Sequence, residues 1–412
     1  MWLSSLRSTV FALCLVPLLP PVSAAATVNG TVRDPAGSPV SGATVLVYSA
    51  GVRKGYSTFC PTCYVDCGKR ATTDAQGGFS IGDLDEDLVF NLIVFQEGKL
   101  PTWLRGTDPQ ENTPLSAVLK ARPQASDAAT RTRGRVIDTS RNGVPFALVE
   151  VVGLQMGTTT SYGGDPEGLA VTDAAGHFEL GELRPRIPGQ VVSAVLLEVK
   201  PRGMAPALHS MQLGATSAEL LAREGATVHG RLLSKGKPVA NAQLTMLTLN
   251  RAAGDTFSPI YIGTDAKGRF SITNVPAGRV WSLDATADSS SASGVVETRY
   301  VATRNDGEVV DAGDLELRPG HSVSGRVILS DGKVLAPGMR IELFTTTGGS
   351  RSSVLAPDGT FMLHGLRGPY EVSPSVRGYR LQGQRVREVL VDRDIPDLVL
   401  TLDPNPPALP GR

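Results

Sequence analysis

The chain repeats one pattern four times, and this repetition constrains the fold more than any other feature of the sequence. Each copy opens with a glycine, one variable residue, and then valine or leucine. The four openings are Gly30-Thr31-Val32, Gly134-Arg135-Val136, Gly230-Arg231-Leu232 and Gly325-Arg326-Val327. The glycines are 104, 96 and 95 residues apart. Intervals of this length correspond to whole domains, because solenoid repeats are only about 20–50 residues long.

A second landmark recurs at nearly the same period. In each copy a turn-forming motif precedes a phenylalanine: TDAQGGF, TDAAGHF, TDAKGRF and APDGTF end at Phe79, Phe178, Phe270 and Phe361. These phenylalanines are 99, 92 and 91 residues apart. We therefore expect four domains in a row. Their predicted ranges are 25–122, 131–224, 225–319 and 320–403, with a polar linker at 123–130 and a proline-rich tail at 404–412.

Each copy has the composition of a β domain. Runs such as residues 44–48 and 148–152 are rich in β-branched side chains and are bounded by turn residues. Asp74 and Gly77 suit a tight connection between strands, since Asp can bind its own backbone and Gly accepts a positive φ. The phenylalanine after this turn should point into the core. The longest stretch with a helical period is 216–223. The sequence thus predicts an all-β protein of four tandem Greek-key β-sandwiches.

Between the two landmarks, the copies share a segment with proline, valine and alanine. The matching residues are Pro39 with Ala43, Pro145 with Ala147, and Pro238 with Ala242, whereas the fourth copy keeps Pro337 without an alanine. The fourth copy also has Ala356 where the others have the early Asp of the turn.

The arrangement G-x-V…P-V-x-x-A-x-V…T-D-x-x-G-x-F resembles the carboxypeptidase regulatory-like domain. This domain is a transthyretin-like (prealbumin-like) β-sandwich, close to the B-type repeats of bacterial collagen adhesins. The resemblance implies non-catalytic modules of extracytoplasmic or surface proteins of bacteria, some of which are classed with carbohydrate-binding-like folds. A fold-level likeness of this kind does not fix an activity.

The adhesin repeats that the chain resembles often carry a Lys–Asn isopeptide bond whose lysine lies on the first strand. Here the corresponding positions carry arginine, at Arg33, Arg135, Arg231 and Arg326. We therefore expect no such bond. Arginines at these positions should face outward and protect strand edges.

Residues 1–24 have the pattern of a secretory signal peptide. Arg7 precedes an apolar run from 10 to 19, and Val22-Ser23-Ala24 follows as a cleavage motif. The run is shorter than the ~20 residues that span a bilayer. We expect cleavage after Ala24, export to the periplasm or cell surface or into the medium, and no transmembrane segment in the mature chain.

The charge balance argues against nucleic acid and anionic membrane as partners. Lys and Arg number 40 and Asp and Glu also number 40, so the net charge is zero, whereas such partners require a basic surplus. No catalytic motif is present. The five histidines lack metal-ligand spacing, and no G-x-S-x-G occurs. We therefore expect that the chain is not an enzyme.

Three cysteines follow the signal peptide, at Cys60, Cys63 and Cys67. Three thiolates suit Cu(I) or Zn(II), with a fourth ligand from elsewhere. The neighbouring Lys69 and Arg70 would favour thiolates, for metal or redox chemistry. The alternative is one disulfide with a free thiol, because export favours oxidation. A bond from Cys60 to Cys67 would contribute about 2.5 kcal/mol by closing the loop between them. Inert free thiols are the third interpretation, and no other cofactor is predicted.

Two weaker signals concern calcium and sugar. The acidic stretch 83–87 has oxygen ligands but fits no calcium loop, so a solvated turn is the simpler interpretation. Sugars stack on exposed aromatic rings, and the mature chain offers Trp103 and Trp281 with scattered tyrosines, among them Tyr162, Tyr261 and Tyr300. Burial is the more common fate of a tryptophan.

These observations lead to three functional hypotheses. The first is an exported, non-catalytic binding or structural module of the bacterial cell envelope, with a glycan or an envelope protein as its partner. The second is a periplasmic metal or thiol-redox protein that uses the three cysteines of the first domain. The third is an accessory subunit of a separate enzyme.

Overall fold

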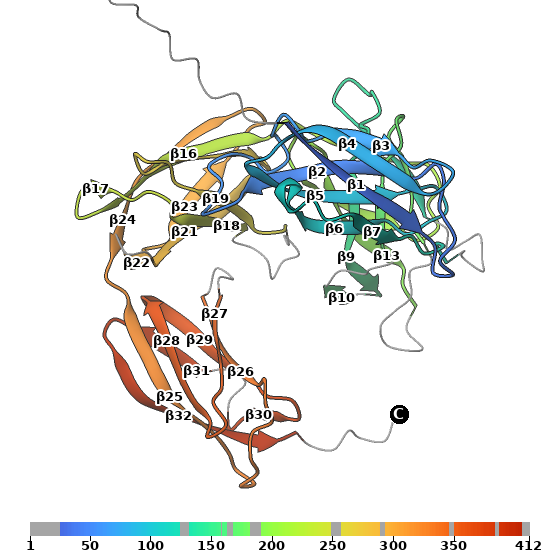
Figure 1. The fold of residues 1–412 in the computed structure, drawn as a ribbon. Helices are drawn as coiled ribbons and strands as arrows, with labels where there is room; N and C mark the ends of the chain where they lie inside the picture. Colours follow the sequence, from blue (N-terminus) through green and yellow to red (C-terminus); the bar gives the residue numbers. More distant parts are fainter. Residues whose placement is uncertain are drawn as a thin grey trace, which may run out of the picture.

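The computed structural model describes residues 25–123, 132–157, 159–162, 168–181, 191–248, 257–288, 293–345, 350–383 and 387–405. These residues form β-sandwiches in chain order, which we call the first (25–118), second (133–221), third (226–318) and fourth (321–404) sandwich (Figure 1). Within the described ranges the helical structure is a single 3-10 turn, η1 (Pro109–Glu111). The all-β prediction is confirmed. The predicted signal peptide, most of the linker and most of the tail lie outside the described residues.

The first sandwich consists of two sheets that enclose its core. The three-stranded sheet has the order β4 (Gly78–Asp85), β1 (Ala25–Arg33) and β7 (Leu115–Val118). The four-stranded sheet has the order β3 (Arg70–Thr72), β2 (Thr44–Val52), β5 (Leu88–Phe95) and β6 (Thr102–Thr107). β1 pairs antiparallel with β4 and parallel with β7. Alternating burial along β4 and β5 supplies side chains to the core between the sheets.

The second and fourth sandwiches repeat this plan. In the second, one sheet contains β12 (His177–Glu179), β8 (Arg133–Ile137) and β15 (Ala218–Leu221); the other contains β10 (Thr159–Tyr162), β9 (Leu148–Met156), β13 (Ala194–Lys200) and β14 (Ala207–Gln212), with β11 (Leu169–Val171) also beside β9. In the fourth, one sheet contains β28 (Thr360–Leu366), β25 (His321–Leu329), β32 (Ile395–Pro404) and β30 (Tyr379–Leu381); the other contains β27 (Ser350–Val354), β26 (Arg340–Phe344), β29 (Gly368–Ser375) and β31 (Arg387–Val391).

The two layers of the third sandwich are joined, because β22 pairs with both β21 and β24. The main path runs β17 (Lys237–Pro238), β16 (Ala226–Ser234), β24 (Val309–Arg318), β22 (Ser293–Val296), β21 (Arg279–Asp288), β18 (Gln243–Thr248) and β19 (Ile260–Gly263), with β20 (Arg269–Val275) beside β16 and β23 (Arg299–Thr303) beside β21. On this path β19 is an edge strand. Each of the four sandwiches has its own hydrophobic core.

The two sequence landmarks face each other across a pair of strands. The opening glycine of each copy is the register partner of the later phenylalanine: Gly30 with Phe79, Gly134 with Phe178, Gly230 with Phe270, and Gly325 with Phe361. All four phenylalanines are buried, as predicted. In the first three copies the ring lies over the glycine, so that a Cβ on Gly230, for example, would be 2.7 Å from the Phe270 ring. The glycine is needed because the ring occupies the space of its side chain.

A buried threonine binds the backbone at the shared alanine in the first three copies. In the first sandwich the Thr73 hydroxyl donates to the Val40 carbonyl at 2.7 Å and accepts from the Ala43 amide at 2.9 Å. Thr172 and Thr264 make the same pair of bonds in the second and third sandwiches. The fourth copy, which lacks the alanine, has the buried Leu355 instead of a threonine.

Aspartates shape the turns as the sequence predicts. Asp74 Oδ1 accepts from the amides of Gln76 and Gly78, and Gly77 has a φ of 77°. Asp173 and Asp265 make equivalent bonds. In the fourth copy the backbone turn is the same, because the Gly359 amide donates to the Ala356 carbonyl and the Ala356 amide donates to the Thr360 carbonyl. Only the side chain differs, since Asp358 and not residue 356 binds the Thr360 amide. The arginines after the opening glycines are exposed or half-buried. Arg231, for example, forms an ion pair with Asp314 on the neighbouring strand β24.

The helical interpretation of residues 216–223 is wrong. Residues 218–221 form β15, which pairs parallel with β8 and buries Leu220 in the second core. A parallel partner that lies about 80 residues earlier in the chain outweighs the weak local period.

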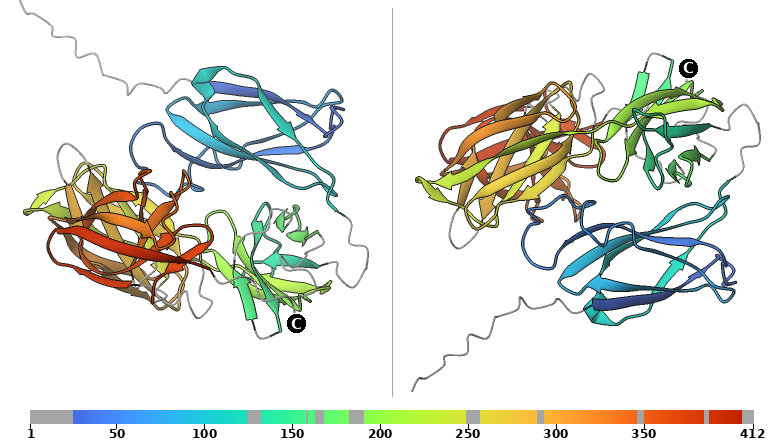
Figure 2. Two further views of the ribbon diagram at one scale, coloured as in Figure 1. Left: turned by 90° about the horizontal axis from the view of Figure 1, so that it is seen from below. Right: turned by 90° about the horizontal axis from the view of Figure 1, so that it is seen from above.

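The first three sandwiches lie against one another, and the fourth stands below them in Figure 1. The two further views in Figure 2 also place the first sandwich beside the second and the third. The fourth contacts the third where β28 approaches β22. The contacts among the first three create the features described next.

Candidate functional site

The cysteines lie in a long connection between β2 and β3, residues 53–69, which we call the cysteine loop. Cys60 and Cys63 form a disulfide with a Cα–Cα distance of 5.2 Å, and Cys67 is free and buried. The prediction of one disulfide with a free thiol is confirmed, but the bond joins Cys60 to Cys63 and not to Cys67. Cys67 belongs to the first core, and its Sγ contacts the Pro61 carbonyl at 3.4 Å.

Burial raises the pKa of the Cys67 thiol to about 11, although the Arg202 guanidinium acts in the opposite direction. The thiol is therefore protonated and weakly nucleophilic at neutral pH. A metal site of three thiolates would require reduction of the disulfide and exposure of this group. Within the described residues, no cluster of three or more His, Cys, Asp or Glu side chains is arranged to hold a metal. The metal interpretation of Cys60, Cys63 and Cys67 stays a prediction for the reduced chain.

We expect the mature chain, residues 25–412, purified without reductant, to show no reactive thiol when native and one thiol per chain after denaturation. Iodoacetamide labelling at pH 7.5 with and without urea, read by mass spectrometry, measures this directly. The Cys67→Ser variant is the control and should show none in either state. Three thiols that become protected when copper or zinc is added to the reduced chain would instead support the metal site.

The cysteine loop docks on the third sandwich. The Tyr56 amide donates to Asn241 Oδ1 at 2.9 Å, and the Gly263 amide donates to the Ser57 carbonyl at 2.6 Å. The Asn274 amide nitrogen lies 3.4 Å from Cys60 Sγ and 3.5 Å from Cys63 Sγ. The disulfide therefore lies at the contact between the two sandwiches.

Polar contacts of Glu198 and Lys200 join the second sandwich to the first and the third. Glu198 is 1% exposed and accepts from the amide and hydroxyl of Ser258 in the third sandwich, at 3.0 and 2.6 Å. Lys200 forms ion pairs with Glu198 and Glu150, and its carbonyl accepts from the Tyr48 hydroxyl of the first sandwich. Burial and the two carboxylates raise the Tyr48 pKa far above its ordinary value, so Tyr48 remains a neutral donor.

An apolar contact reinforces the junction of the first and second sandwiches. Leu46, Tyr48 and Ile93 on the first pack against Leu148 on the second. Trp103 belongs to this contact, with its ring centroid 5.4 Å from that of Tyr48 and the Arg105 guanidinium 4.5 Å from its own centroid. Trp103 is therefore half-buried in this contact, with the Arg105 guanidinium over its ring.

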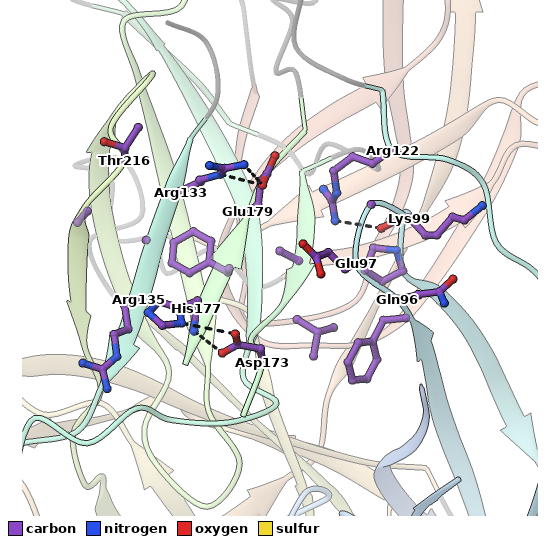
Figure 3. Close-up of a pocket in the computed structure, with 18 of the residues that line it drawn as sticks. Gln96, Glu97, Lys99, Arg122, Arg133, Arg135, Asp173, His177, Glu179 and Thr216 are labelled. Carbon is purple, nitrogen blue, oxygen red and sulfur yellow. Dashed lines mark hydrogen bonds and ion pairs between the residues drawn. The ribbon is translucent and has the colours of Figure 1, made fainter. Parts of the chain in front are cut away.

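A cleft of about 920 Å³ opens between the first and second sandwiches (Figure 3). One wall is the outer face of the β12–β8–β15 sheet, with Arg133, Arg135, His177 and Glu179. The other wall is the connection that follows β5, with Glu97 and Lys99, and the cleft also includes Arg122. Such a volume is within the ~300–1,000 Å³ of ligand sites.

Both signs of charge line the cleft. Arg133 and Glu179 form an ion pair at 2.8 Å, and His177 Nδ1 lies 3.5 Å from Asp173. Arg122 donates to the carbonyls of Lys99 and Leu169, which connects the two walls, and burial lowers its pKa. Alternating charges with little aromatic surface suit a polar, hydrogen-bonding ligand better than an apolar one.

The remaining sugar and calcium candidates are distributed elsewhere. Trp281 is fully buried in the third core, whereas Tyr261 and Tyr300 are about half exposed on that sandwich. Tyr162 lies in β10, and its side chain is outside the described residues. In the acidic stretch 83–87, Asp85 caps the Asp87 amide and the Lys69 ammonium binds the Asp83 carbonyl, as expected of a solvated turn. Among described residues, no helix has the length and hydropathy to cross a membrane.

No protein-family model and no curated protein matches the chain. Among solved structures it is similar to the Bacillus anthracis TIE protein (12% identity, 94% of this chain, 76% of that chain, TM-score 0.21). It is also similar to two B repeats of the Staphylococcus aureus collagen-binding protein (12%, 93%, 100%, TM-score 0.19) and to GBS52, a minor pilin of Streptococcus agalactiae (12%, 46%, 100%, TM-score 0.24). B repeats are the adhesin modules that the sequence resembles. TM-scores this low carry no inference about what the chain does.

Sequence reasoning missed the residues that join the sandwiches. Asn241 and Asn274 had no evident role, yet both have a positive φ, at 53° and 59°. The equivalent positions in the first copy, Gly42 and Asp83, also have a positive φ. The only available signal was that the third copy carries asparagine at two positions where its backbone needs Gly, Asn or Asp.

Proposed function

We propose that the chain is an exported, non-catalytic binding protein in which the first three sandwiches form one platform. One observation carries this proposal. Each pair among these sandwiches is joined by specific polar contacts, namely Tyr48 to Lys200, Glu198 to Ser258, and Asn274 to the disulfide. Fixed neighbours keep the cleft between the first and second sandwiches preformed, and preformed sites bind at lower entropic cost.

Export is supported by the disulfide. Disulfides persist in oxidising compartments and are rare in the cytosol. We propose a location at the cell envelope or outside the cell. Expression of the full chain in a bacterial host, followed by fractionation and N-terminal sequencing, tests this.

The ligand that we propose for the cleft is a glycan or a peptide segment of an envelope protein. Both offer many hydrogen-bonding groups to Arg133, Arg135, Glu97 and Glu179, the charged side chains of the two walls. The carbohydrate-binding-like classification of the resembling family favours the glycan.

We expect the Arg135→Ala variant to bind that ligand at least tenfold more weakly than the wild type. Screening the mature chain against a glycan array and cell-wall fractions, followed by calorimetry, provides the measurement. The matched control is Arg326→Ala, which removes the equivalent arginine of the fourth copy, away from the cleft. Equal losses in both variants, or no binding by the wild type at millimolar ligand, would contradict the proposed function.

A further inference from the structure

We propose that the Cys60–Cys63 disulfide is a reversible redox-modification site that fastens the first sandwich to the third, with a dithiol as its reaction partner. This inference does not depend on what the cleft binds, because it concerns only the contact between these two sandwiches.

The first observation is that one amide group contacts both sulfurs. Asn274 Nδ2 lies 3.4 Å from Cys60 Sγ and 3.5 Å from Cys63 Sγ. The covalent bond holds the two sulfurs side by side, so that one donor reaches both. Two separate thiols rotate independently and have no reason to stay under the same amide.

The second observation is that the loop covers a strand edge. β19 ends its sheet, and the Gly263 amide on its outer side donates to the Ser57 carbonyl. The approach is so close that a Cβ on Gly263 would be 2.6 Å from the Tyr56 carbonyl oxygen. Docking of the loop therefore satisfies an edge amide that would otherwise need water.

The third observation concerns the other side of the disulfide. Pro61, between the two cysteines, accepts from the Ala50 amide of β2 at 2.8 Å and from the Cys67 thiol at 3.4 Å. Its carbonyl is thus fixed to the first sandwich, while the sulfurs contact the third. The short ring that the disulfide closes therefore links the Pro61 contacts on the first sandwich to the Asn274 contacts on the third.

The chemistry is a thiol–disulfide exchange. One thiolate of the dithiol attacks one sulfur of the Cys60–Cys63 disulfide, which forms a mixed disulfide and releases the other cysteine as a thiolate. The second thiol of the dithiol then attacks its own sulfur in the mixed disulfide and releases the remaining cysteine. Two electrons and two protons pass to Cys60 and Cys63, and the dithiol becomes a disulfide. A protein disulfide of an oxidising compartment reverses the step. Cys60 and Cys63 are half-buried beside the exposed Pro61, which leaves a path for a small dithiol.

Contacts other than those of the cysteine loop limit the effect of reduction. The Tyr48–Lys200 and Glu198–Ser258 bonds involve no cysteine and keep the second sandwich attached to both neighbours. Reduction should therefore release the first sandwich from the third without unfolding either.

Hydrogen exchange of the mature chain, oxidised and after dithiothreitol, tests this inference. Mass spectrometry must show three free thiols in the reduced sample. We expect exchange of the Tyr56 and Gly263 amides to become at least tenfold faster, while amides of β2 and β5 keep their rates. Unchanged exchange at Tyr56 and Gly263 would overturn the proposal. So would faster exchange throughout β2 and β5, because the disulfide would then stabilise the first sandwich and not the contact.

A variant that leaves the cysteines intact provides a second test. Gly263→Ala should weaken the docked loop in the oxidised chain and reproduce the fast exchange of Tyr56. Gly51→Ala is the matched control, since a Cβ at Gly51 has no neighbour within 4 Å. Slow exchange of the Tyr56 amide in the oxidised Gly263→Ala variant would contradict the proposal, because docking of the cysteine loop would then not depend on the close approach of Tyr56 to Gly263. Ligand binding to the cleft is measured separately, so that failure of either proposal can be distinguished.

Discussion

Replacing Trp281 with alanine should lower the free energy of unfolding of the third sandwich by about 3–5 kcal/mol, the cost of removing a large aromatic side chain from a core. Trp281 is fully buried, its ring packs against Phe257, and its Nε1–H donates to Thr303 Oγ1 at 3.1 Å and to the Pro276 carbonyl at 3.3 Å. Alanine leaves a cavity that these neighbours fill only in part. Urea unfolding followed by circular dichroism measures the loss.

The Trp281→Phe variant is the control for this prediction. It keeps most of the ring volume and removes the indole N–H, and Thr303 Oγ1 still donates to the Pro276 carbonyl at 2.8 Å. We therefore expect a clearly smaller loss than for alanine. A stable Trp281→Ala protein that has lost affinity for a sugar would instead show that this tryptophan is a ligand platform.

Replacing Lys200 with methionine should cost about 3–5 kcal/mol at pH 7, because a buried carboxylate loses its counter-charge. Glu198 is 1% exposed and remains beside Ser258, with Glu150 nearby. Burial lowers the pKa of Lys200, but Glu198 and Glu150 more than compensate and raise it above 10.5. In the wild type the ammonium therefore contributes stability below pH 10.5, and this contribution is lost as the pH rises through the raised pKa.

The pH dependence separates this effect from lost packing. The wild type loses its ammonium as the pH rises through the raised pKa of Lys200, so the difference between wild type and Lys200→Met should be constant below pH 10.5 and shrink above it, as measured by urea unfolding at each pH. Lys333→Met, which removes an exposed lysine paired with Asp331, should leave stability nearly unchanged. A deficit that stays constant as the pH rises above 10.5 would contradict the electrostatic explanation.

The repeating landmarks were sufficient to predict the fold because they are partners in space. Gly30 and Phe79 meet across β1 and β4, and in the first three copies the ring excludes any side chain at the glycine. Thr73 is part of the repeated turn motif, so the sequence shows it. Its bonds to Val40 and Ala43 join segments about 30 residues apart, and the spacing of the motif does not predict them.

The candidate site was less predictable from sequence. The cysteines were visible, but their pairing depended on Cys67 pointing into the core, which spacing does not reveal. The contacts of Glu198, Lys200 and Asn274 depend on how whole sandwiches lie against each other. Such contacts involve few residues on each surface, and single exposed polar residues carry no periodic signal.

The facing glycine and phenylalanine also determine where this design tolerates change in length. Gly30 and Phe79 are 49 residues apart in the chain, whereas Gly325 and Phe361 are 36 apart, yet both pairs occupy facing positions. Part of the difference lies between the second and third strands of each copy, residues 53–69 in the first and 345–349 in the fourth. The core therefore depends on the facing pair and not on the length of this connection, which differs from copy to copy.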